Sequence, residues 1–441
     1  MRLSWHDLGT PRADKANGKT VEIAGFPLTL LPAGSADYFL MMAEPGCCQG
    51  CAPNNPLAVV EVTADRPLRL GNGALRLTGT WHVSSDSDSW RYQLRNAEVK
   101  PGVTRRALMA ASPLFCLPVP AMAQAADGMA VDIHSHAGNL TAMSYGRGSF
   151  APVADPMRQG GLSVICLAIV ADSPIIKTID GRYRPGREPA PLELSNFSKR
   201  AFETLHALVR EQGMPIIRTA ADLRAARSTR PSVIVASEGG DFLDGRLDRL
   251  DEAYNRWQLR HLQLTHYRPN ELGDIQTEPA EKGGLTAFGA DVIRRCNSLG
   301  IVVDVAHGTF ELVKKAAAVT AKPLVLSHTA LTQRPSPWTR LITPDHAKVI
   351  AGTRGVIGIW PVTQTYTIQS YADSIARMVD VVGVDHVGMG TDLLGLGGQS
   401  ALPRYADLPQ LAAALRTRFN ADETAKLLGG NYRRVFEASL A

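Results

Sequence analysis

The chain has 441 residues, of which 45% are hydrophobic and 20% are charged; this composition excludes a disordered or collagen-like protein. The formal net charge of +5 is small for this length, and no dense run of Lys and Arg occurs, so no nucleic-acid partner is expected. Six thinly spread cysteines do not form the framework of a disulfide-rich domain. Since no run of roughly 18 apolar residues is uninterrupted, no stable transmembrane span is predicted.

Residues 1–100 are predicted to form a small all-β domain, either a barrel or a sandwich. Short apolar runs alternate there with turn residues, at 20–23, 38–42, 57–62, 75–81 and 90–94. A Cys-rich loop with Cys47, Cys48 and Cys51 follows the second run. A Cys-x-x-Cys pair can bind metal or change redox state, but the second pair of a zinc ribbon is missing. We therefore expect loop thiols or one disulfide, and no function is predicted for this domain.

Residues 101–126 resemble a twin-arginine export signal. Arg105 and Arg106 precede an apolar run at 107–123, which ends in small residues of the A-x-A type at 121–125. A signal predicts a periplasmic or exported enzyme, with translation starting near Val103. Alternatively, the chain is a fusion in which this segment is a linker or an internal anchor, and the protein is cytoplasmic.

Residues 127–441 are predicted to form a (β/α)₈ TIM barrel. Eight runs of strand length occur at 130–134, 162–170, 233–238, 259–266, 301–307, 324–328, 355–360 and 387–392. Helical periodicity is clear at 197–212 and 288–299. This number of strand–helix units over this length is typical of the barrel. A doubly wound open sheet is the competing fold, but no G-x-G-x-x-G motif follows the first strand.

Polar side chains gather at the ends of these predicted strands. Six of the eight end in a residue that can bind metal or transfer a proton, namely His134 (with His136), Glu238, His266, His307, His328 and Asp392. In a parallel barrel these ends converge on the catalytic face. The remaining histidines serve as a control, because they fall in the N-terminal domain, in helices or near strand starts.

Each of these residues has a structural explanation when it is taken alone. A single buried His is commonly a hydrogen-bonded core residue, and Asp392 could cap a helix. The joint pattern favours a metal site, because neutral imidazole and carboxylate are ligands that suit Zn²⁺. A carboxylate bridging two ions about 3.5–4 Å apart is the geometry of two-metal hydrolases, which generate hydroxide from bound water near neutral pH.

The region 127–441 resembles the membrane dipeptidase (renal dipeptidase) family of zinc peptidases, within the amidohydrolase superfamily. The residues that carry the resemblance stand in the family's order, at 131–134, 237–240, 262–266, 284–289, 303–307, 326–328, 388–392 and 429–436. The resemblance implies a metal-dependent dipeptidase that binds two divalent metal ions, expected to be Zn²⁺. It implies a small peptide as substrate and leaves a homodimer open.

The resemblance also implies a role for each site residue. His134 and His136 bind one ion, His307 and His328 bind the other, and Glu238 bridges them. His266 contacts the substrate and polarises the scissile carbonyl, and Asp392 is the catalytic acid and base. An Arg after the sixth strand binds the substrate carboxylate; its spacing before a Pro-Asp pair favours Arg340, with Arg334 as the alternative. Asp132 is expected to be structural or to support the ligands.

One position departs from the family pattern. The first strand of the family usually carries His-x-Asp, and this chain has His134-Ser135-His136. His136 can ligate through nitrogen, as in the wider superfamily, but it removes one negative charge from the site. The departure leaves the metal preference and the substrate range open.

Three functions fit the sequence. The first is hydrolysis of L-L and L-D dipeptides through attack of metal-bound hydroxide on the scissile carbonyl. The second is another amidohydrolase reaction, on a cyclic amide, lactone or phosphoester, but many such enzymes use a carbamylated Lys where this chain has His266. The third is a catalytically degenerate metal-binding or sensor protein.

Overall fold

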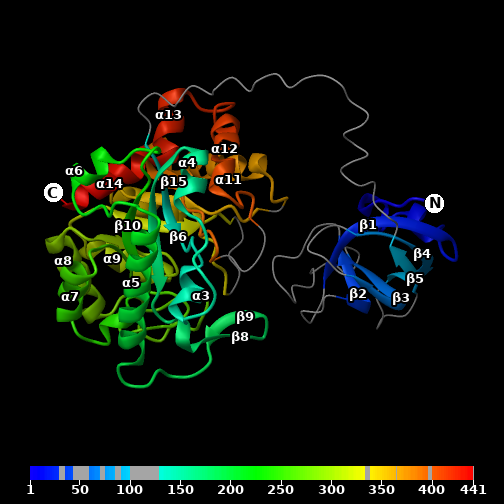
Figure 1. The fold of residues 1–441 in the computed structure, drawn as a ribbon, viewed down its shortest axis with the longest axis horizontal. Coiled ribbons are helices and arrows are strands. Elements are labelled where there is room, and N and C mark those ends of the chain that lie inside the picture. Colours follow the sequence, from blue (N-terminus) through cyan, green and yellow to red (C-terminus); the bar gives the residue numbers. More distant parts are fainter. Residues whose placement is uncertain are drawn as a thin grey trace. The chain divides into compact units, whose positions relative to one another are not determined.

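The computed structural model describes residues 1–28, 35–42, 59–69, 75–84, 91–99, 129–332, 338–363, 365–395 and 400–440. The chain forms two compact units, a smaller N-terminal one and a larger C-terminal one (Figure 1). The signal-like segment at 104–125, the cysteines of the N-terminal loop and Arg334 lie outside the described residues.

The N-terminal unit is a closed five-stranded barrel. Its strands follow the order β1 (Thr20–Leu28), β2 (Ser35–Met42), β3 (Val59–Arg69), β5 (Tyr92–Val99) and β4 (Leu75–Val83), preceded by η1 (Trp5–Asp7) and α1 (Pro11–Asp14). Strands β3 and β5 pair in parallel, whereas the other strand pairs described in this unit are antiparallel. Alternate side chains such as Leu77 and Trp81 point into the core. The predicted small all-β domain is confirmed, and it is a barrel rather than a sandwich.

The C-terminal unit is built on an eight-stranded parallel sheet. In spatial order the strands are β6 (Ala130–Ser135), β7 (Leu162–Val170), β10 (Ser232–Glu238), β11 (Leu259–Gln263), β12 (Val302–Asp304), β13 (Leu324–Thr329), β14 (Val356–Ile359) and β15 (Val387–Met389). A parallel bridge between Ser135 and Leu393 joins the two edges. The predicted (β/α)₈ barrel is thereby confirmed.

Helices surround the strands (Figure 1). They are α3 (Leu140–Ser144), α4 (Ala154–Gly160), α5 (Glu193–Glu211), α6 (Ala220–Ala225), α7 (Asp248–Arg256), α8 (Ala287–Leu299), α9 (Phe310–Val319), α10 (Pro344–Gly352), α11 (Ile368–Val382), α12 (Leu408–Leu415), α13 (Ala421–Ala425) and α14 (Asn431–Leu440). Several begin at a threonine that accepts a backbone N–H, as Thr286 does for α8 and Thr309 for α9. Within the described residues, no helix has both the length and the apolar composition needed to span a membrane.

Short elements complete the C-terminal unit. They are the hairpin β8 (Ile176–Ile179) and β9 (Arg182–Pro185), the 3₁₀ turns η3 (Ser173–Ile175), η4 (Asp241–Leu243), η5 (Val384–His386) and η6 (Tyr405–Asp407), and the π turn η7 (Lys426–Gly430).

The apolar core has two layers that follow the alternation of the strands. On β7, Ile165 and Leu167 belong to the large cluster shared with the outer helices, whereas Val164 and Cys166 belong to a smaller inner cluster. Tyr432 and Phe436 of α14 complete that inner cluster, which contains residues near the start of most strands. Helix α14 therefore closes the amino end of the barrel and leaves the carboxyl end for the site.

Candidate metal centre

The seven metal and proton-transfer residues predicted from the sequence converge at the carboxyl end of the barrel. They are His134, His136, Glu238, His266, His307, His328 and Asp392, and all are buried. His134 lies within β6, Glu238 ends β10 and His328 lies within β13. Buried ionisable groups are costly unless they are paired or coordinate a metal, so their convergence indicates a built site.

Three of the predicted strand ends are wrong. The runs were expected to end at His266, His307 and Asp392, but each strand stops three residues earlier. The backbone of His307 (φ 67°) and of Asp392 (φ 49°) is left-handed, a conformation that cannot continue a strand. Non-glycine residues held in this conformation are concentrated at functional sites, where the surrounding structure supports the strain.

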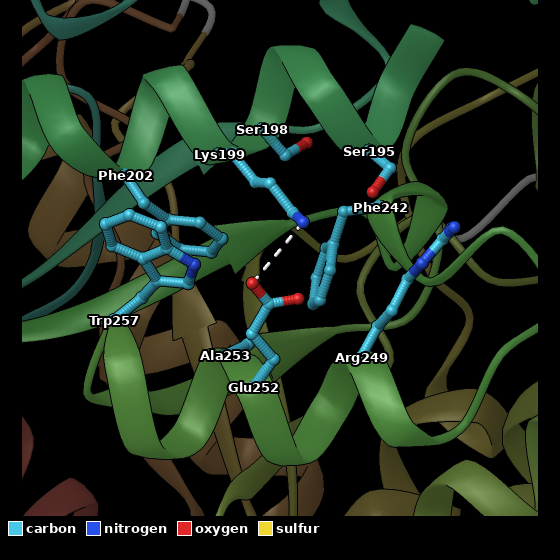
Figure 2. A pocket seen from close by; sticks show the side chains of 9 residues that line it. All are labelled: Ser195, Ser198, Lys199, Phe202, Phe242, Arg249, Glu252, Ala253 and Trp257. Atoms are coloured by element: carbon cyan, nitrogen blue, oxygen red, sulfur yellow. Dashed lines mark ion pairs between the residues drawn. The ribbon is translucent and has the colours of Figure 1, made fainter. Parts of the chain in front are cut away.

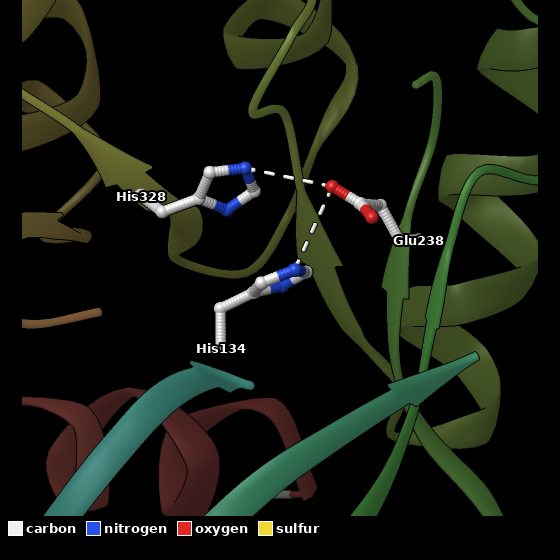
Figure 3. Close-up of side chains that lie close together, drawn as sticks. All are labelled: His134, Glu238 and His328. Carbon is white, nitrogen blue, oxygen red and sulfur yellow. Dashed lines mark ion pairs between the residues drawn. The ribbon is translucent and has the colours of Figure 1, made fainter. Parts of the chain in front are cut away.

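The Glu238 carboxylate is the centre of the cluster. Its Oε1 lies 3.2 Å from His307 Nε2, 3.5 Å from His328 Nε2 and 3.6 Å from His134 Nε2. Figure 3 shows His134 and His328 directed at this one oxygen from two different strands. A single carboxylate oxygen thus faces three imidazole nitrogens.

The second oxygen of Glu238 faces another group of ligands. Oε2 lies 3.1 Å from His136 Nε2 and 3.3 Å from His266 Nε2. Asp392 Oδ1 lies 3.4 Å from His136 Nε2 and 3.8 Å from His134 Nε2. The two oxygens of Glu238 therefore face different sets of side chains, an arrangement that suits a bridging carboxylate.

The donor atoms fit divalent cations. His134 and His136 oppose their Nε2 atoms at 3.1 Å, and His307 and His328 do the same at 3.1 Å. His136 Nδ1 donates to the Ala168 carbonyl, so the Nε2 atom of the neutral ring carries a lone pair directed into the site. Two nitrogens each about 2.0–2.1 Å from one zinc ion would lie at nearly this separation.

Three overlapping sets of donor atoms each lie within 4.8 Å of one another. The sets are His134 with Glu238 and His328, His134 with His136 and Asp392, and Glu238 with His266 and His307. Glu238 and His134 are each shared by two of these sets. The cluster therefore offers more than one position for an ion.

The electrostatics of the cluster favour the protonation states that metal ligands need. Burial holds the pKa of His134 and of His307 well below the ordinary value, so both rings are neutral. Burial alone would raise the pKa of Glu238, but the charge of nearby His266 and a hydrogen bond from His136 outweigh it and hold that pKa well below its usual range. Ionised carboxylate and neutral imidazole are the ligand forms that bind Zn²⁺.

His136 differs from the other histidines. Burial acts to lower its pKa, but hydrogen bonds to Asp392 and Glu238 outweigh that effect and raise the pKa to about 10. The two carboxylates thus attract positive charge to this position. A divalent ion there would supply that charge in place of the proton.

Arg340 carries unused hydrogen-bonding capacity beside the cluster. Its Nη1 donates to Gln276 Oε1 at 3.0 Å, whereas buried Nε and Nη2 have no hydrogen-bond partner among the described residues. After burial, the Arg340 charge is the main influence that lowers the pKa of His307, so the guanidinium lies within electrostatic reach of the site. Two unpartnered donors of a planar guanidinium suit a carboxylate.

The family model of the membrane dipeptidases (peptidase family M19) matches residues 149–440. The chain belongs to this family. The match covers well over half of the chain, and it begins after β6, the strand that contains His134 and that His136 directly follows. The resemblance inferred from the strand-end motifs is thereby confirmed.

Individual relatives are distant. The dipeptidase tcpJ of Claviceps purpurea is 26% identical over 48% of this chain and 52% of its own length. The chain therefore spans about half the length of this curated relative. Two crystal structures share the fold. Dipeptidase AC is 23% identical, with a TM-score of 0.61, and the match covers 71% of this chain and 99% of that one. A metallopeptidase from Rhodobacter sphaeroides is 22% identical, with a TM-score of 0.60, and the match covers 70% of this chain and 99% of that one.

Sequence reasoning missed Asp172. This fully buried residue follows β7 and holds His266, with Oδ1 2.7 Å from His266 Nδ1. Its position in the sequence could have identified it, because Asp172 lies two residues beyond the second predicted strand of the barrel. The other polar site residues also lie at the ends of predicted strands. A carboxylate separated from its strand by a residue or two belongs to the same face of a parallel barrel.

Two buried aspartates accept hydrogen bonds from the backbone next to the candidate ligands. Asp304 accepts hydrogen bonds from the backbone N–H groups of Ala306 and Ser327, each next to a candidate ligand histidine. Asp132 accepts the N–H of Thr391, which precedes Asp392, and the Thr391 hydroxyl as well. The expectation that Asp132 is structural agrees with these contacts.

A hollow between α5 and α7 lies apart from the metal centre (Figure 2). Aromatic side chains line one end of it, where Phe202 and Trp257 stack with ring centres 6.0 Å apart. Lys199 and Glu252 pair across it at 3.3 Å. Because these opposite charges already satisfy one another, this pair leaves no free charge for a ligand.

Proposed function

We propose that this protein is a metallodipeptidase that binds two divalent ions, with Zn²⁺ as the expected metal. His134, His136 and Glu238 would hold one ion, and Glu238, His307 and His328 the other. The observation that carries the proposal is the Glu238 carboxylate, whose two oxygens face five imidazoles within 3.6 Å. Membership of the membrane dipeptidase family supports the same assignment.

The remaining site residues bind and orient the substrate. When bound, the ions supply Lewis-acid chemistry, which polarises a carbonyl and lowers the pKa of water. Arg340 offers two unpartnered donors to the terminal carboxylate of the substrate. His266 presents Nε2 beside Glu238, where it can donate to the oxygen of the scissile carbonyl.

Asp392 is proposed to carry the proton. Its buried Oδ1 faces His136 Nε2, and an ion bound at His136 would replace the proton of that contact and leave the oxygen able to accept a proton and to return it to the leaving amine. The oxygen lies within 3.4 Å of His136 Nε2, on the side of the cluster defined by Glu238 Oε2.

Dipeptides fit this arrangement better than longer peptides. A guanidinium beside the metal ligands would bind a carboxylate only one residue away from the scissile bond. We include L-D as well as L-L dipeptides, because the similar Rhodobacter sphaeroides metallopeptidase is liganded with a phosphinate mimic of the dipeptide L-Ala-D-Ala.

An assay of the purified protein tests the function. L-L, L-D and N-acetylated dipeptides are compared with a cyclic amide, a lactone and a phosphoester, and Asp392→Asn is the control. We expect turnover of dipeptides, and a loss of kcat by about 10²–10⁴-fold in the variant with its metal content unchanged. Turnover of the other compounds without dipeptides would assign a different amidohydrolase reaction, and bound metal without turnover would indicate a sensor.

We also propose that the enzyme is exported, on the strength of the paired arginines and apolar run at 104–125. The alternative is a cytoplasmic fusion protein in which this segment joins two domains.

A further inference from the structure

Asp172 directs both of its carboxylate oxygens at one short segment of chain. It lies just after β7 and is fully buried. Oδ1 lies 2.7 Å from Nδ1 of His266, and Oδ2 accepts the backbone N–H of Tyr267 at 3.0 Å. A single side chain thus fixes both the ring of His266 and the backbone that follows it.

The contact with Oδ1 determines the hydrogen-bonding role of His266 Nδ1. A carboxylate oxygen accepts hydrogen bonds, so Nδ1 carries the proton of that contact. The other ring nitrogen, Nε2, faces a second carboxylate oxygen, Glu238 Oε2, 3.3 Å away, so it carries a proton as well and can donate to a substrate carbonyl. The ring is also enclosed by Tyr267 and His307, with ring centres 4.5 and 4.7 Å away.

We propose that Asp172 is a positioning residue for the reaction. It holds His266 with Nδ1 as the hydrogen-bond donor and with Nε2 directed at the metal centre, where the scissile carbonyl would lie. This inference rests on the proposed function for its catalytic consequence. The placement of the ring proton depends on the contacts alone.

A second buried aspartate provides a matched comparison. Asp241 follows the next strand, β10, and holds the same loop through Arg268 at 3.1 Å and Asn270 at 3.1 Å. No imidazole is among its hydrogen-bond partners within the described residues. Loss of Asp241 therefore disturbs the loop without acting directly on the ring of His266.

The isosteric variant Asp172→Asn makes a specific prediction. The Tyr267 N–H needs an acceptor, so the amide oxygen of Asn faces it and the amide NH₂ faces His266 Nδ1. An NH₂ group requires an acceptor at Nδ1, so the ring loses its Nδ1 proton and keeps the proton on Nε2. The substitution thus removes the hydrogen bond that Nδ1 donates while it leaves the size of the side chain unchanged.

Nitrogen-15 NMR of the zinc-loaded, full-length protein with labelled histidine tests the inference. His266→Gln assigns the His266 signals by their loss. We expect a protonated Nδ1 in the wild type and in Asp241→Asn, and a protonated Nε2 with unprotonated Nδ1 in Asp172→Asn. We also expect kcat for a dipeptide to fall about 10–100-fold in Asp172→Asn, with KM and metal content little changed.

A wild-type His266 with Nδ1 unprotonated would overturn the inference, and this result needs no variant to fold. An Asp172→Asn protein that keeps a protonated Nδ1 and the wild-type kcat would overturn it as well. Absence of dipeptide turnover in the wild type would contradict the proposed function alone, because the position of the ring proton is measured independently of activity.

Discussion

Arg340 keeps two buried nitrogen atoms without a hydrogen-bond partner among the described residues. Leaving buried donors unpaired is unfavourable, and the burial of this guanidinium lowers its pKa. A substrate carboxylate would satisfy both donors and the charge at once. We therefore interpret the two unpaired donors of Arg340 as a binding site for the substrate carboxylate.

Replacement of this side chain should weaken substrate binding. Because a hydrogen bond to a charged group contributes about 1.5–3 kcal/mol, we expect Arg340→Ala to raise KM for a dipeptide by about 10–100-fold. Steady-state kinetics measure the effect. The matched control is the same dipeptide with an amidated C-terminus. For this substrate, KM should differ far less between the wild type and Arg340→Ala. An equal loss for both substrates would contradict the role of Arg340.

The residue types of the site were predictable because chemistry restricts them. His and Glu at successive strand ends could be recognised without a structure, since parallel strands bring those ends together. Asp172 was not recognised, because its partner His266 is 94 residues away in sequence and only folding joins them. The choice between Arg340 and Arg334 likewise depends on a loop path that spacing does not determine.

His136 stands where the family usually has an aspartate. The structure places its Nε2 3.1 Å from Glu238 and 3.4 Å from Asp392, so the ring reaches the position of a ligand. Histidine brings no negative charge to the ion, and the neighbouring carboxylates supply the charge that is present. The metal preference therefore depends on Glu238 and Asp392 as much as on His136.

At the scale of elements, Asp304 connects two segments that contain proposed metal ligands, one following β12 and one in β13. It ends β12 and accepts N–H groups from Ala306 and from Ser327 of β13, at 2.9 and 3.1 Å. It also lies 3.1 Å from the ring of His261. His307 and His328 each follow one of the anchored residues, so this carboxylate sets the distance between the two ligands.

We expect Asp304→Ala to weaken the ion held by His307 and His328 by about 10–100-fold, since residues that orient metal ligands typically contribute this much. Metal titration of the purified protein measures the affinity of each ion. Asp132→Ala is the matched variant, because Asp132 anchors the other half of the site through Thr391. Equal and unchanged affinities in both variants would exclude this function for the two aspartates.

The local sequence pattern predicted the helix ends better than the strand ends. Helices α5 and α8 were predicted nearly to their ends, because an amphipathic period continues through each. The short strands β11, β12 and β15 were predicted too long, since the polar ligands that follow them lie among apolar residues. Left-handed turns at His307 and Asp392 end the strand pattern there, and these turns follow from tertiary packing.

At the scale of the whole molecule, the proposed metal ligands all belong to the C-terminal unit. The fold class of that unit was predictable from the number of strands and the helices between them. For the N-terminal unit the sequence left a barrel or a sandwich open, because closure depends on pairing between distant strands such as β3 and β5. Local propensity does not encode such long-range pairings.

The signal-like segment between the units leads to a prediction about processing. If it directs export, N-terminal sequencing of protein from the native host should find a start near Gln124 or Asp127, because signal peptides are removed after small-residue sites. The recombinant full-length chain is the control for accidental proteolysis. An intact Met1 in the native protein would favour the cytoplasmic fusion.

The central claim, that Glu238 and the surrounding histidines hold catalytic metal ions, is tested most directly by metal removal. Elemental analysis of the purified protein should find about two divalent ions per chain. A chelator should remove both the ions and the dipeptidase activity, and added Zn²⁺ should restore them. A protein that is free of metal and still cleaves dipeptides at the full rate would contradict the account.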